Sequence, residues 1–267
     1  MAGDSVSTVA QSVFANSDYY FSNSMIASWI VTITLVIITR IATKDMKLIP
    51  AGLQNFMEMI FESIYNLLES MLGDKLTKKT FWFFSVLFVF IVVSNWSGLL
   101  PFTGNFVVKY GTTEIPLWRP GTADVNLTLA MALTYLALWF IWSIQEVGFV
   151  GFLKHIFAPK GKTMGIMGIF MAVVAIGIGL IELVSLSFRP ISLSLRLYGN
   201  IFGGENVMHS MALPLIGVPF YFLELMVGLI QGMVFTMLAA VFLALMCEHE
   251  HEHEHEHEHA HEHEDGH

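Results

Sequence analysis

The composition of this chain is that of a membrane protein. Its 267 residues are 55% hydrophobic and 13% charged, and that charged fraction is about half that of an ordinary soluble domain, which excludes a soluble globule and also intrinsic disorder. The formal net charge of −9 arises at the C-terminal end, because residues 248–267 hold nine of the 22 acidic residues, and the remaining 13 acids balance the 13 basic residues. The sequence therefore predicts an all-α polytopic membrane protein.

The N-terminal half contains three apolar blocks of crossing length. Residues 1–23 are polar and lack the basic start of a secretory signal peptide, so we expect the apolar block 25–42 to remain as the first transmembrane helix. Residues 49–72 have apolar side chains at helical spacing interrupted by glutamates, which predicts an amphipathic helix, either at the membrane surface or as a connector. Blocks 81–100 and 127–144 each fit one further crossing.

The C-terminal half is dominated by two longer apolar blocks, 164–212 and 217–246. The first is about twice the length that one upright helix needs to cross a bilayer. It is therefore either one tilted or re-entrant element or a pair of crossings. We expect a single membrane domain over 24–247 that ends in this long hairpin, about 164–247.

The distribution of Lys and Arg between the blocks predicts the orientation of the chain. If 164–212 is one element, nine basic residues lie in loops on one side of the membrane and two, Lys109 and Arg119, lie on the other. Basic loops are retained in the cytoplasm. The N-terminus is then outside and the C-terminus inside, whereas two crossings of block 164–212 would move the C-terminus outside.

The long hairpin contains ionisable residues at membrane depth, which are functional candidates by default. Glu182, Arg189 and Arg196 are spaced by seven residues and so share nearly one helical face. Arg189 precedes a proline and either belongs to this functional set or extends its side chain to the cytoplasmic interface. Arg196 lies deeper and is followed by Glu205 and by the small-residue pair Gly199-x-x-x-Gly203, which predicts a close helix neighbour.

A hairpin turn near residues 211–215 brings the second block alongside the first. Glu224 and Gln231 are seven residues apart on one face of that block. At 1.5 Å per residue, Arg196 and Gln231 both lie roughly 21–23 Å from the turn, so we expect them to meet at similar depth. Glu205 and Glu224 both lie nearer the turn and are placed to relay a cation.

These positions predict two half-channels separated by an electrostatic barrier. Glu182 lies on one side of Arg196, and Glu205 and Glu224 lie on the other. An arginine stays protonated and repels cations, so a continuous cation channel would not contain one at its middle. The alternatives are a secondary transporter that binds an anionic substrate at Arg196, which predicts internal repeats, and a structural scaffold, which leaves the buried charges unexplained.

Four segments resemble subunit a of F-type ATP synthases. They are SLRLYGNIFGGE at 194–205, LIQGMVFTML at 229–238, ADVNLTLAMAL at 123–133 and WSGLLP at 96–101, and the resemblance covers about 75–247. The resemblance implies long tilted helices in the C-terminal hairpin, about five transmembrane helices and no covalent catalysis by this chain.

The resemblance also implies roles for individual residues. Arg196 matches the arginine that attracts an ionised ring carboxylate and blocks leakage between the half-channels. For the outer half-channel and its surroundings, the resemblance implies Asn200, Glu205, Glu224 and Gln231. For the inner path, it implies Glu182 and Ser185. Asp124 and Asn126 are implied as channel-side polar groups. His209, near the hairpin turn, is either a vestibule residue or a simple interface residue.

The partners that the resemblance implies are a ring of c subunits, peripheral-stalk b subunits, the remainder of the F-type ATP synthase and the lipid bilayer. No cofactor, bound metal or nucleic acid is expected, and the location is a bacterial inner membrane. Proton and sodium coupling both stay open, because the selecting carboxylate belongs to the ring. We expect the tail 248–267 to be a disordered cytoplasmic segment with no essential role, although its alternating His and Glu also suit metal binding, proton buffering or a purification tag.

Overall fold

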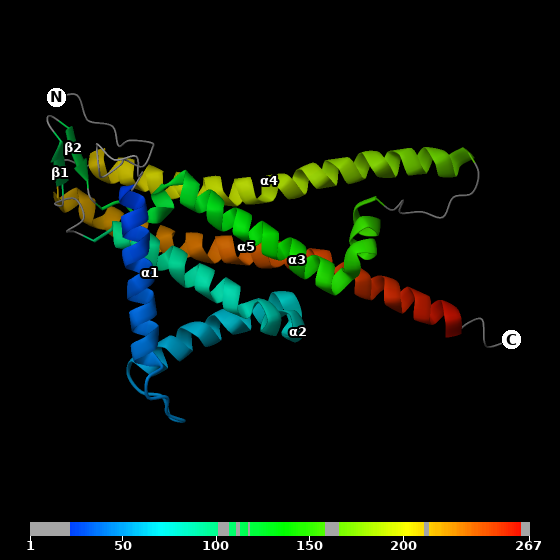
Figure 1. The fold of residues 1–267 in the computed structure, drawn as a ribbon, viewed down its shortest axis with the longest axis horizontal. Coiled ribbons are helices and arrows are strands. Elements are labelled where there is room, and N and C mark those ends of the chain that lie inside the picture. The colour runs from blue at the N-terminus through cyan, green and yellow to red at the C-terminus, as the bar shows by residue number, and fades with distance from the viewer. Residues whose placement is uncertain are drawn as a thin grey trace. The chain divides into compact units, whose positions relative to one another are not determined.

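The fold is a set of long helices that suits a membrane. The computed structural model describes residues 22–100, 107–110, 113–116, 118–157, 166–210 and 214–262. Within that part of the chain, five helices, α1 to α5, are long and apolar enough to cross a membrane (Figure 1). The predicted all-α membrane fold with about five crossings is therefore confirmed.

Helix α1 (Asn23–Ala42) begins at a capped end. The Ser22 hydroxyl accepts a hydrogen bond from the Ser24 backbone N–H, which satisfies one of the open donors of the first turn. One face of α1 is buried, including Ala27 and Val31, and the helix contacts α2. Much of its apolar surface is exposed, as expected for a helix that faces lipid.

Helix α2 (Leu53–Gly98) consists of two arms that join at Gly73. Gly73 has a φ of +73°, a left-handed conformation that costs little only for glycine. Figure 1 shows the second arm of α2 folding back at this point. The break separates the amphipathic segment 49–72 from the crossing 81–100 that the sequence predicts.

The connection from α2 to α3 contains structure that the sequence analysis did not anticipate. Strands β1 (Val107–Tyr110) and β2 (Thr113–Pro116) form an antiparallel hairpin in which Val107 pairs with Pro116. A short 3₁₀ turn, η2 (Gly121–Ala123), follows and leads into α3 (Val125–Phe157), which breaks at Gly148. The hairpin is a small addition to a helical fold.

The long C-terminal hairpin consists of α4 (Ile166–Ser210) and α5 (Pro214–Glu262). Helix α4 continues through Pro190 as one element, which favours the single-element interpretation of block 164–212 over two crossings. The bounds of α5 extend into the tail, so its backbone is helical as far as Glu262. Disorder of the tail in solution stays a prediction.

The chain divides into two compact units, each of which takes part of α3, α4 and α5. The first comprises residues 1–130 and 194–238, and the second comprises 131–193 and 239–267. In the second unit, the Tyr135 hydroxyl donates to the backbone oxygen of Ala239 at 2.8 Å. The single membrane domain that we expect over 24–247 stays a prediction.

Candidate functional site

Arg196 lies on an exposed face of α4 in the first unit. Its side chain is exposed, and within the described part of the chain it has no hydrogen-bond or ion-pair partner. Ile191 and Leu195 nearby are also exposed, so the arginine lies beside exposed apolar side chains. Ser194, two residues earlier and on the opposite side of the helix, is hydrogen-bonded through its hydroxyl to the hydroxyl of Thr128 on α3 at 3.0 Å.

Asn200, one turn beyond Arg196, contacts α5. Its Nδ2 donates to Oε1 of Gln231 at 2.6 Å, and Gln231 is only 4% exposed. The sequence predicts that Arg196 and Gln231 meet at similar depth, and the structure places Gln231 against the turn that follows Arg196. A buried amide that is hydrogen-bonded in this way fixes how α4 and α5 align.

Glu224 lies against the backbone of α4. A Cβ atom built on Gly204 would overlap the Glu224 carboxylate, so only glycine leaves room for this side chain in its present position. Beside it is a cavity of about 290 Å³. Its lining comprises Gly199, Asn200, Gly203, Gly204, Val207, Phe220, Leu223, Glu224 and Val227.

The glycines of the hairpin differ in what lies next to them within this chain. The pair Gly199 and Gly203 predicts a close helix neighbour, but a Cβ at either position would meet nothing within 4 Å among the described residues. These glycines instead leave space along the cavity. On α5, a Cβ on Gly232 would lie 2.7 Å from Val92 Cγ2, so the close approach is between α5 and α2. Gly228 supports it, because its carbonyl oxygen accepts from the Asn95 side chain at 3.2 Å.

Asp124 is buried and engaged by neighbouring helices. Its carboxylate accepts from the Ser24 hydroxyl at 2.7 Å and from the Asn126 backbone N–H at 3.0 Å. The second contact caps the start of α3. The structure therefore gives Asp124 an anchoring role between α1 and α3, while the Asn126 side chain is exposed. Their part in a channel stays a prediction.

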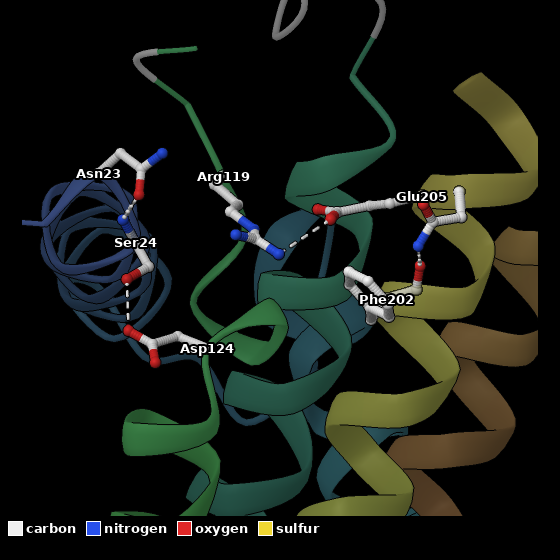
Figure 2. A network of polar contacts seen from close by, with 7 residues as sticks. Asn23, Ser24, Arg119, Asp124, Phe202 and Glu205 are labelled. Carbon is white, nitrogen blue, oxygen red and sulfur yellow. Dashed lines mark hydrogen bonds and ion pairs between the residues drawn. The ribbon is translucent and has the colours of Figure 1, made fainter. Parts of the chain in front are cut away.

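Arg119 is a residue that sequence reasoning missed as a site candidate. It is 5% exposed, and its Nη2 lies 3.4 Å from Oε2 of Glu205, whose side chain is 22% exposed (Figure 2). In the sequence Arg119 counts only toward the basic residues of an outer loop. The available signal was its position four residues before the ADVN segment, in a loop with few other charges.

The predicted inner residues belong to the second unit. Glu182 is half-buried and Ser185 is exposed on α4. The Arg189 guanidinium lies 4.5 Å from the centre of the Phe242 ring, so this arginine stacks on α5 within the same unit. The His209 side chain lies outside the described residues.

Comparisons with known proteins agree with this architecture. Residues 25–244 match the family model described as ATP synthase A chain. The chain is 33% identical over 230 residues to ATP synthase subunit a of Solidesulfovibrio magneticus, covering 85% of each chain. It is 33% identical over 219 residues to that of Geobacter sulfurreducens, covering 81% of this chain and 83% of the relative.

A relative from a photosynthetic organelle is similar to the same degree. The chain is 34% identical over 225 residues to the chloroplastic ATP synthase subunit a of Stigeoclonium helveticum, covering 82% of each chain. The family match spans most of the chain and covers nearly all of the five helices that can cross a membrane. This protein is therefore a multi-pass membrane protein that belongs to the ATP synthase subunit a family.

Proposed function

We propose that this chain is the stator proton-channel subunit of a rotary F-type ATP synthase, in which two offset half-channels load and unload protons on ring carboxylates and Arg196 separates them. One observation carries the proposal: Arg196 is exposed on α4, one turn from Asn200, which lines the cavity together with Glu224 and donates to Gln231. Because the chain belongs to the subunit a family, the alternative of a secondary transporter is not supported.

The exposed arginine implies a partner outside this chain. A guanidinium stays charged at any working pH, and a charge on a lipid-facing surface costs several kcal/mol. A carboxylate presented by a ring of c subunits would neutralise it. The space left by Gly199 and Gly203 beside Arg196 supports close passage of such a ring.

The outer half-channel contains Glu205, Glu224, Asn200 and Gln231. The half-buried carboxylate of Glu224 reaches the cavity, which Asn200 also lines, and Asn200 donates to Gln231. His209 would belong to the outer vestibule, and Asp124 and Asn126 are channel-side polar groups.

The inner path contains Glu182 and Ser185 on the cytoplasmic part of α4. The location that we propose is a bacterial inner membrane with the N-terminus outside and the C-terminus cytoplasmic. Peripheral-stalk b subunits would hold the chain static against the ring, and nucleotide chemistry would occur on the peripheral sector, so this chain is non-catalytic.

The proton cycle follows from the charges. A proton enters from outside and neutralises a ring carboxylate that leaves Arg196. The neutral site then enters lipid, because burying the ionised form would cost several kcal/mol. After nearly one turn the site reaches the inner path and loses its proton. Each charge gains about 2.3 kcal/mol per 100 mV of membrane potential.

The test is the Arg196→Ala variant in membrane vesicles that contain the whole ATP synthase. We expect assembly to be retained and proton-driven ATP synthesis to be lost, because the ring carboxylate loses its counter-charge and the half-channels lose their barrier. Arg40→Ala, which removes an exposed arginine from the last turn of α1, is the matched control and is expected to keep activity. Normal coupled synthesis by Arg196→Ala would overturn the proposal.

A further inference from the structure

A short buried segment crosses the outer ends of the helices and carries an arginine that the proposed function does not use. We name residues 118–124 the outer strap. Its Trp118 Nε1 donates to the backbone oxygen of Ser97 at 3.0 Å, near the end of α2. A Cβ on Gly98 would lie 2.7 Å from Pro120 Cγ, so the strap packs directly on the α2 backbone.

The other end of the strap is equally well held. A Cβ on Gly121 would overlap the Ser28 hydroxyl of α1, and Asp124 accepts from the Ser24 hydroxyl. Residues 119–124 are all buried. The strap is therefore fixed at both ends, and the backbone from which Arg119 projects is in a defined position.

From this fixed backbone Arg119 reaches Glu205 on α4. Figure 2 shows its guanidinium pointing toward the Glu205 carboxylate, away from Asp124, which points toward Ser24. Besides Arg119, the charged group that acts on Glu205 among the described residues is Glu224 of α5. Glu205 is thus paired with a buried cation on the strap and is also close enough to a second carboxylate, that of Glu224, to be affected by its charge.

We propose that Arg119 is a positioning residue of the outer half-channel, which orients the Glu205 carboxylate and determines the outside pH at which it takes up a proton. This inference rests on the proposed function, because it assigns Arg119 to the same proton path. The role of Arg119 differs from that of Arg196. The Arg196 side chain is exposed, whereas Arg119 is buried and paired with Glu205 inside the chain.

The physical basis is the interaction of two opposite charges in a region with little water. A cation within about 4–6 Å favours the ionised form of a carboxylate, typically by 1–3 pH units. Removing the cation therefore lets the carboxylate hold its proton at higher pH. Removing one partner of a buried ion pair also destabilises a protein more than removing both, because the remaining charge is left buried without a partner.

The experiment uses the whole ATP synthase reconstituted in vesicles. The pH on the side of the outer half-channel is varied while the opposite side and the membrane potential are held constant, and the rate of ATP synthesis is measured. For Arg119→Met we expect the pH of half-maximal rate to rise by about one unit or more. Arg119→Lys retains the charge and is expected to keep most of the wild-type profile, and Arg40→Met, which removes an exposed arginine, is expected to keep all of it.

A purely structural role would lower the amount of assembled complex without moving the pH profile. An Arg119→Met complex that assembles, makes ATP and has the wild-type profile would therefore overturn the inference. If this variant does not assemble, the double variant Arg119→Met with Glu205→Gln is compared with it. We expect the double variant to assemble better, because neither charge is left buried alone, and equal failure of both would also overturn the pairing.

The two proposals fail in different ways. If wild-type vesicles show no proton-driven synthesis, or if Arg196→Ala retains it, the proposed function fails. If wild-type vesicles are active and Arg196→Ala is inactive at every pH, but Arg119→Met keeps the wild-type profile, only the role of Arg119 fails.

Discussion

The Glu224 side chain of α5 lies against Gly204 of α4 at the candidate site. The absence of a side chain at Gly204 lets a carboxylate from α5 lie directly on the α4 backbone and reach the cavity. Only the flexible end of Glu224 would have to move if a side chain were added. The glycine therefore affects the position of a charge more than it affects packing.

We predict that Gly204→Ala lowers proton transport while leaving the complex assembled. The added Cβ displaces the Glu224 carboxylate, and displacements of about 1 Å at a reacting group commonly cost 10-fold to 100-fold in rate. The measurement is ATP-driven proton pumping into inverted vesicles at matched amounts of complex. Gly177→Ala, on an exposed part of α4 where a Cβ meets nothing within 4 Å, is the control that separates the clash from a change in helix propensity. Pumping by Gly204→Ala at the control rate would contradict the prediction.

At the scale of structural elements, the outer strap contacts α1 and α2 and leads into α3. Its anchors are polar contacts to Ser24 and Ser97 and close packing on Gly98. Such a segment has almost no secondary structure of its own. Its order depends on buried hydrogen bonds, which cost most when only one partner is removed.

We predict that Ser24→Ala destabilises the protein by about 1–3 kcal/mol, because Asp124 then keeps a buried carboxylate oxygen without its donor. Thr43→Ala removes an exposed hydroxyl that bonds only within its own helix, and it is expected to have little effect. Thermal inactivation of the purified complex in detergent measures both. Equal inactivation temperatures for the two variants would show that the Ser24 contact does not anchor the strap.

The elements that could be predicted from the sequence are those determined by apolar runs. Five blocks of sufficient length indicate five crossings, and equal distances from one turn place Arg196 and Gln231 at similar depth. The strap was not predicted, because Arg119 and Glu205 are far apart in the sequence and no periodic pattern connects a loop residue to a helix. The contact at Gly204 was missed for a related reason: the spacing of Gly199 and Gly203 indicates that a helix face is smooth but does not say what faces it.

For the molecule as a whole, the functional charges and the most numerous charges lie in different places. The tail 248–267 carries the excess of acidic residues, while the body is neutral. Buried residues near the end of the second unit include Leu243 and Met246, just before the tail. The packed part of α5 therefore extends at least to the residue before Cys247.

We predict that truncation after Cys247 leaves assembly and proton transport at wild-type levels. The deletion keeps the buried residues Leu243 and Met246 and brings the formal net charge from −9 to zero. ATP synthesis in vesicles and the yield of assembled complex are the measurements. A version of the tail with every His replaced by Gln is the companion variant, and a loss of transport in both would assign the histidines a role that the body does not supply.

The contact between Asn200 and Gln231 has a consequence for the direction of the motor. Both side chains end in carboxamides, and each carboxamide contains one acceptor and one donor group. If both groups rotate by half a turn, donor and acceptor exchange and the hydrogen bond is restored in the opposite sense. The hydrogen bond can therefore form with either amide as the donor, and it does not favour one direction of proton movement. The sense of rotation would be decided by the electrochemical gradient and the nucleotide balance.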